Sequence, residues 1–131
     1  MKKDDNININ AYQKEAAEKW GDTDAYREYT AKTKEYSEND YGNITEGLNN
    51  ILSEFSVCMK KGNPALSDEA QGLVKKLQMY ITDNLYTCTN EILSGLGQMY
   101  VYDNRFKANI DKHTDGTADY INRAIKVYCT N

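Results

Sequence analysis

The length, composition and charge of the chain place it among small globular proteins. Its 131 residues match the commonest size of one domain and are too few for a ligand sensor joined to a DNA-reading module. Hydrophobic residues make up 40% and charged residues 27% of the chain, and its formal net charge is -4. The absence of a basic cluster excludes direct contact with nucleic acid, and the absence of an apolar run of about 18 residues excludes a membrane span.

The cysteines indicate the compartment. Cys58, Cys88 and Cys129 are odd in number and show no CxxC or Cys/His spacing, which argues against a disulfide framework and against a zinc site. We therefore expect a cytoplasmic protein with no metal ion and no other cofactor.

The chain divides into two parts. Residues 1–10 are rich in asparagine and lack an apolar period, so we expect a flexible lead-in, followed by one domain over residues 11–131. Within that domain Gly21 can end one helix, and Asp22 or Thr23 can cap the next.

Tyrosines then occupy helical positions that usually hold leucine or isoleucine. Tyr26, Tyr29 and Tyr36 are expected to share one helix face with Thr33. Tyrosine buries a ring but keeps a hydroxyl that needs a hydrogen-bond partner. This face therefore suits a boundary that is partly exposed to water and covers another part of the molecule.

Apolar residues recur at spacings of three and four through the rest of the chain, which predicts an all-α fold. Three long helices are expected, from the cap Ser37 to Gly62, from Ser67 to about Asn84, and from about Thr89 to Asp103. A short helix through Arg105, Phe106 and Ile110, a turn at Thr114-Asp115-Gly116 and a last helix are expected to follow, the last burying Ala118, Ile121, Ile125 and Tyr128 and exposing Asn122, Arg123 and Lys126.

Catalytic chemistry is absent from the sequence. His113 is the one histidine and stands in a polar turn, which favours a surface role over a catalytic one. Gly95-Leu96-Gly97 lacks the preceding strand and the spacing of a phosphate-binding loop. We therefore expect no catalytic residues, and an enzyme is the least favoured hypothesis.

The feature left over is a surplus of aromatic residues, with 11 tyrosines beside Trp20, Phe55 and Phe106. Filling the core explains Tyr41, Tyr80 and Tyr128 as well as ligand binding does. Aromatic residues near glycines and caps are less suited to a core and more typical of a ligand pocket: Trp20, Tyr26, Tyr29, Tyr100 and Tyr102.

Two segments carry a family resemblance. Trp20-Gly21-Asp22-Thr23-Asp24-Ala25-Tyr26 and Leu96-Gly97-Gln98-Met99-Tyr100-Val101-Tyr102-Asp103-Asn104-Arg105-Phe106 resemble signature segments of the TipAS family, the drug-sensing domain of certain MerR-type transcriptional activators. The resemblance continues through Lys107-Ala108-Asn109-Ile110-Asp111 and spans roughly Tyr12 to Cys129 in register.

The resemblance implies a globin-like helical domain with a hydrophobic cleft for thiopeptides or other bulky peptide-like antibiotics, covered by mobile N-terminal helices. It implies either the effector part of an activator, whose DNA-binding and dimerising half would lie outside this chain, or a stand-alone form that sequesters the drug. The residues expected to line the cleft are Trp20, Tyr26, Tyr29, Tyr80, Tyr86, Cys88, Met99, Tyr100, Asp103, Phe106 and Asn109.

Two departures from the family pattern bear on the mechanism. Some members capture the drug covalently through a cysteine directly before the Leu-Gly of the second segment, where this chain has Gly95; related sequences also often carry a histidine where it has Leu77. Cys88 stands where a family cysteine can also occur, but its flanking threonines activate a thiolate only mildly. We expect reversible binding, and the competing hypothesis is a structural or protein-interaction domain that has lost drug binding.

Overall fold

The computed structural model describes Lys19, residues 23–112 and residues 114–130, without the side chains of Thr23, Arg105 and Phe106. The regular structure of these residues is entirely helical. Its elements are α2 (Thr23–Thr33), α3 (Glu38–Lys60), α4 (Asp68–Asn84), α5 (Asn90–Tyr102), α6 (Asn104–Asp111) and α7 (Thr117–Thr130). The predicted lead-in, Trp20 and His113 lie outside the described residues.

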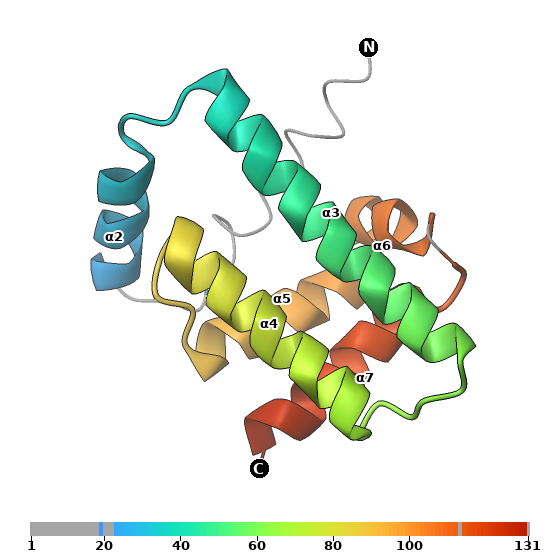
Figure 1. Ribbon diagram of the computed structural model, residues 1–131. Coiled ribbons are helices and arrows are strands. Elements are labelled where there is room, and N and C mark those ends of the chain that lie inside the picture. Colours follow the sequence, from blue (N-terminus) through green and yellow to red (C-terminus); the bar gives the residue numbers. More distant parts are fainter. Residues whose placement is uncertain (1–18, 20–22, 113, 131) are drawn as a thin grey trace.

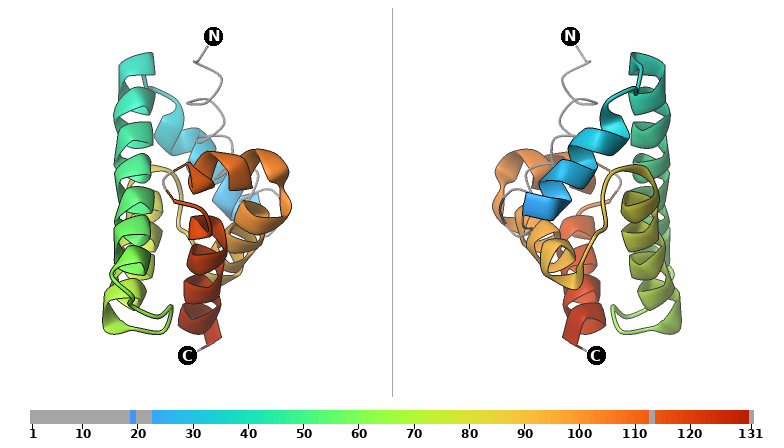
Figure 2. Two further views of the ribbon diagram at one scale, coloured as in Figure 1. Left: turned by 90° about the vertical axis from the view of Figure 1, so that its right-hand side faces the viewer. Right: turned by 90° about the vertical axis from the view of Figure 1, so that its left-hand side faces the viewer.

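The helices form two layers in a globin-like arrangement. Figure 1 shows α3 and α4 side by side, with α4 returning along α3 so that its end approaches α2. Helices α5, α6 and α7 lie on the other side of this pair, as Figure 2 shows in the two turned views. The most extensive helix pairings are α5 with α7 and α3 with α4. No helix in the described ranges is long and apolar enough to cross a bilayer.

The helix starts are set locally by the capping residues predicted from the sequence. The Ser37 hydroxyl accepts a hydrogen bond from the Asp40 N–H at 3.1 Å, while the Asp40 carboxylate accepts one from the Ser37 N–H at 2.9 Å. The hydroxyls of Ser67 and Thr89 cap α4 and α5 by accepting from the N–H groups of Ala70 and Ile92, without the reciprocal carboxylate bond. Each cap satisfies a backbone donor that the first helical turn leaves unpaired, so the predicted starts of these three helices are confirmed.

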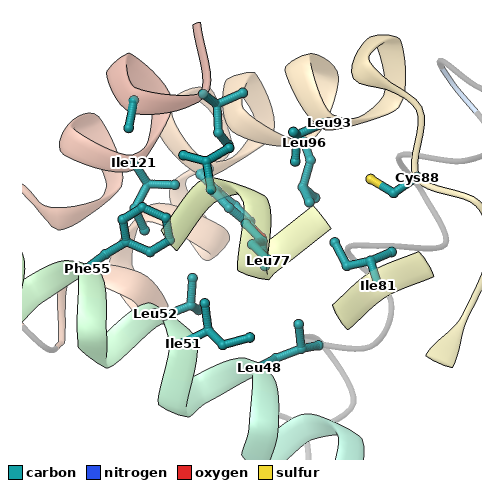
Figure 3. Packing of buried hydrophobic residues seen from close by; sticks show 14 of the residues in the cluster. Leu48, Ile51, Leu52, Phe55, Leu77, Ile81, Cys88, Leu93, Leu96 and Ile121 are labelled. Atoms are coloured by element: carbon teal, nitrogen blue, oxygen red, sulfur yellow. The ribbon is translucent and has the colours of Figure 1, made fainter. Parts of the chain in front are cut away.

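The core lies between the two layers. Figure 3 shows Leu77 of α4 near its centre, among Phe55 of α3 and Leu93 and Leu96 of α5. All four side chains are fully buried. Cys88 lies at the edge of this cluster, so the segment that carries it is attached to the core.

The structure corrects the predicted face of Tyr26, Tyr29, Thr33 and Tyr36. Helix α2 ends at Thr33, so Tyr36 lies in the connection to α3 instead of on the α2 face. Its hydroxyl donates to the Asn84 carbonyl at 2.6 Å. The helical period placed Tyr36 wrongly because it ignored the turn that separates α2 from α3.

The structure also corrects the predicted exposure of Asn122. This side chain is only 7% exposed and faces Gly97 of α5, and its Oδ1 has no hydrogen-bond partner. A glycine at position 97 lets α7 approach α5 closely enough to cover a face that the sequence pattern assigned to solvent.

Candidate ligand-binding site

The connection from α4 to α5, residues 85–89, brings the predicted site residues Tyr86 and Cys88 into the interior. The Leu85 N–H and the Tyr86 N–H both donate to the Ile81 carbonyl, at 2.8 and 3.2 Å, which turns the chain at the end of α4. Leu85, Tyr86 and Cys88 are 1%, 0% and 4% exposed. The connection is therefore a packed element and not a loose loop.

Tyr86 is the centre of an aromatic group under α2. Its ring centroid lies 6.4 Å from that of Tyr29, with the planes tilted by 53°. Burial raises the pKa of Tyr86, and the nearby Cys88, Tyr100 and Tyr29 raise it further. The Tyr86 hydroxyl therefore stays neutral at physiological pH and can act only as a hydrogen-bonding group.

Both polar backbone groups of Cys88 are hydrogen-bonded, and its thiol has low reactivity. Its N–H donates to the Thr82 hydroxyl at 3.1 Å, and its carbonyl accepts from the Gln78 amide at 2.7 Å. Burial, with a smaller contribution from Cys129, raises the pKa of the Cys88 thiol to about 12. At neutral pH almost no thiolate is present, which makes Cys88 a poor nucleophile.

Helix α2 is attached to this connection mainly by side chains. The Glu28 carboxylate accepts from the Thr87 N–H at 2.9 Å and from the Thr87 hydroxyl at 2.7 Å. The bond from Tyr36 to Asn84 fastens the chain just beyond α2. Tyr26, at 44% exposure, remains on the open side of the helix. Besides these polar contacts, Ala25 is buried in the core and Tyr29 packs against it. The attachment is narrow, so α2 is suited to opening and closing.

The structure places the other predicted site residues in different parts of the fold. Met99 and Tyr100 are buried in α5, at 7% and 1% exposure, so Tyr100 belongs to the core more than its sequence context indicated. Tyr80 points toward α3, where its hydroxyl donates to the Ile44 carbonyl at 3.0 Å. Asp103 caps the end of α5 and is half-buried.

Two further residues of that set lie on α6. Asn109 is half-buried there, whereas Phe106 has only its backbone described. The structure thus brings together Tyr29, Tyr86, Cys88 and Tyr100, and it sets Tyr80 apart from them.

A separate groove of about 410 Å³ lies between the second half of α3 and the first half of α4. It is lined by Ser53, Glu54, Val57, Cys58, Lys61, Asn63, Glu69 and Leu73. None of these residues belongs to the predicted site. The sulfur of Cys58, one of these lining residues, is 3.2 Å from the Tyr120 hydroxyl, which links α3 to α7.

Several residues that shape the site have no signal in the sequence. Glu28 and Thr87 are 59 positions apart, and Gln78 and Thr82 lie on a helix that was predicted from the spacing of its apolar residues. Their roles depend on which backbone groups the fold brings near them. Within the described residues no group of three or more acidic, histidine or cysteine side chains could hold a metal ion.

Known proteins similar to this chain share its sequence pattern and its fold. The TipAS antibiotic-recognition domain matches residues 12–128. The HTH-type transcriptional activator TipA of Streptomyces coelicolor is 38% identical over 87% of this chain, and mta of Bacillus subtilis is 32% identical over 75% of it. The chain spans 45% of the length of TipA and 37% of the length of mta.

A solved structure supports the same relationship. TipAS from Streptomyces lividans in complex with nosiheptide, described as part of a thiopeptide antibiotic multidrug resistance system, superposes with a TM-score of 0.74 at 36% identity. The superposition covers 92% of this chain and 85% of that one. With the sequence match over nearly its whole length, the chain belongs to the TipAS antibiotic-recognition domain family.

Proposed function

We propose that residues 11–131 bind bulky peptide-like antibiotics of the thiopeptide class reversibly, in a cleft between α2, the connection 85–89 and α5. The observation that carries the proposal is the contact between Tyr29 of α2 and Tyr86 of the connection, whose ring centroids are 6.4 Å apart, at the place where Glu28 bonds α2 to Thr87. A helix held in this way can open to admit a large ligand and then close over it, because few apolar contacts oppose its movement.

The roles proposed for the site residues follow from their chemistry. Tyr26, Tyr29 and Tyr86 offer aromatic surface, each contact contributing about 1 kcal/mol, so that several are needed for tight binding. Trp20, Phe106, Asp103 and Asn109 are proposed to extend this surface and to orient polar groups of the ligand, with Met99 and Tyr100 forming the wall behind it.

Capture is proposed to be non-covalent. The position directly before Leu96-Gly97 is Gly95, which has no nucleophile, and the remaining candidate, Cys88, is 4% exposed with a pKa of about 12. A thiol that is neither accessible nor ionised does not add to a dehydroamino acid at a useful rate. The proposed mode of binding is therefore non-covalent contact of the ligand with aromatic side chains.

The biological setting follows from the relatives. TipA and mta are transcriptional activators more than twice as long as the matching region. We propose that this chain is the ligand-sensing part of a MerR-type activator in the cytoplasm, or a stand-alone form that sequesters the drug. Neither form is an enzyme, and neither places this domain in contact with DNA.

Titration with nosiheptide and other thiopeptides, followed by the fluorescence of Trp20, tests the proposal, since the chain has one tryptophan. A saturable change that reverses on dilution, with the protein mass unchanged, is expected. A mass increase equal to the ligand would show covalent capture and contradict the reversible mode. Saturation by no thiopeptide would favour the competing structural or protein-interaction domain.

A further inference from the structure

Gln78 of α4 uses both N–H donors and the oxygen of its side-chain amide in one hydrogen-bond network beside the proposed cleft. Its Nε2 group donates to the Cys88 carbonyl at 2.7 Å and to Asn90 Oδ1 at 2.9 Å. Its Oε1 accepts from the Tyr128 hydroxyl of α7 at 2.8 Å. Four segments therefore meet at one side chain: α4, the connection 85–89, the start of α5 and the end of α7.

The network fixes the backbone of the connection that carries Tyr86. Thr82, one helical turn after Gln78 on the same face of α4, accepts from the Cys88 N–H at 3.1 Å. Both polar backbone groups of Cys88 are thus bonded to α4 side chains. On the other side of the connection, Glu28 of α2 bonds Thr87. The connection is held between the body of the domain and its proposed cover.

Only an amide of this length satisfies the network. A carboxamide supplies two N–H donors and an acceptor oxygen, and all three are used here. Glutamate at this position would place an acceptor against the Cys88 carbonyl, and leucine would leave that carbonyl and the Tyr128 hydroxyl without this partner. Leucine at position 78 keeps a similar volume and removes the bonding groups.

We propose that Gln78 is a positioning residue for the ligand cleft: it holds the connection 85–89 against α4 and couples the end of α7 to the cleft through Tyr128. This inference rests on the function proposed above. Gln78 does not itself touch the ligand. Binding sites keep their geometry through such supporting bonds, since a side chain that is free to shift by an ångström loses much of its contribution.

The chain offers a matched control in Gln71, two helical turns earlier on α4. Gln71 is half-buried like Gln78, and its Nε2 group also donates to two acceptors, the carbonyls of Ala65 at 2.9 Å and Ala124 at 3.0 Å. Those bonds join α4 to the α3–α4 connection and to the middle of α7, away from residues 85–89. Replacing Gln71 removes an equal number of donated bonds without touching the cleft.

The experiment compares Gln78→Leu, Gln78→Glu and Gln71→Leu in the whole chain by nosiheptide titration and by amide exchange. For Gln78→Leu we expect nosiheptide affinity to fall about tenfold and exchange at residues 85–90 to rise about tenfold, with exchange in α3 unchanged. Gln71→Leu is expected to leave both quantities within about twofold of the original chain. Gln78→Glu, which keeps the acceptor but loses both donors, is expected to resemble Gln78→Leu.

Equal effects of Gln78→Leu and Gln71→Leu on exchange at residues 85–90 would overturn the positioning role and leave Gln78 as an ordinary structural residue. Normal exchange with weakened binding would also overturn it, because the effect would then be direct contact. Failure of the unsubstituted chain to bind nosiheptide would count against the proposed function, while the exchange comparison would still decide the role of Gln78.

Discussion

The carboxylate of Glu28 and the backbone and hydroxyl of Thr87 form a paired contact across 59 residues of sequence, with hydrogen bonds of 2.9 and 2.7 Å. One side chain of α2 thereby satisfies two donors of the α4–α5 connection. The contact is exposed, so water competes with it, and its net contribution is smaller than that of a buried pair. Its effect is to add a polar attachment to the small apolar contact that Ala25 and Tyr29 of α2 make with the core.

Substitution of Glu28 by alanine is expected to release α2 while leaving the rest of the domain intact. Local opening of residues 23–33 is expected to become easier by about 1 kcal/mol, with global stability changed by less than that. Amide exchange measured residue by residue distinguishes the two quantities. Glu46→Ala, at an exposed position on α3, serves as the control. Protection of α2 that survives Glu28→Ala would show that other contacts hold the helix.

Substitution of Ser37 by alanine is expected to destabilise the domain by about 0.5–2 kcal/mol, because it removes one half of the capping box at the start of α3. The partner substitution Asp40→Ala is expected to cost less, since the Ser37 hydroxyl still accepts from the N–H at position 40. Urea unfolding followed by circular dichroism measures both changes. An equal loss in the two variants would contradict this ranking.

A methyl group at position 97 is expected to destabilise the α5–α7 pair. A Cβ there would lie 2.8 Å from Asn122 Oδ1 and 3.2 Å from Ile125 Cδ1. Gly97→Ala is expected to cost about 1–3 kcal/mol, and Asn122→Ala in the same chain is expected to recover part of that loss. Thermal unfolding of the single and double variants measures the coupling.

Gly72→Ala is expected to change the stability of the domain in the opposite direction to Gly97→Ala. Gly72 lies within α4, and a Cβ there would meet nothing within 4 Å. The substitution is expected to stabilise the domain by about 0.5–1 kcal/mol, because alanine restricts the unfolded chain more than glycine does. A loss at Gly72 similar to that at Gly97 would contradict this expectation and show that the contact with Asn122 does not determine the effect at position 97.

The free energy of unfolding is expected to fall at alkaline pH because of the raised pKa of Cys88. Its pKa is about 12 in the folded chain against 9.0 for an unburied thiol, so the unfolded chain loses its proton first as the pH rises. The stabilisation is complete below pH 9 and is lost between pH 9 and 12, at about 1.4 kcal/mol for each pH unit. Urea unfolding across this range is expected to show a shallower decline in Cys88→Ala than in the original chain.

The parts of the structure that the sequence predicted are those decided over one turn of chain. Ser37, Ser67 and Thr89 cap helices because each side chain reaches backbone groups only three residues away. The all-α fold follows from spacing alone. These features require no knowledge of which helices pack together.

The parts that the sequence did not predict depend on contacts between distant segments. Asn122 is buried because Gly97 admits it, Tyr100 is buried because helices cover α5 on several sides, and Tyr80 bonds to α3 because α4 returns along that helix. For the site, residue type identified aromatic candidates, but only the fold separates Tyr86, in the aromatic group, from Tyr80.

The burial of α5 has a consequence for how this domain diversifies. Seven of its 13 residues are buried: Ile92, Leu93, Gly95, Leu96, Gly97, Met99 and Tyr100. Such a helix tolerates few substitutions, whereas α2 presents open positions such as Tyr26. If every position is randomised and the library is selected for binding of other antibiotics, the accepted substitutions are therefore expected to lie mainly in α2. The sequence of α5 is expected to stay almost unchanged.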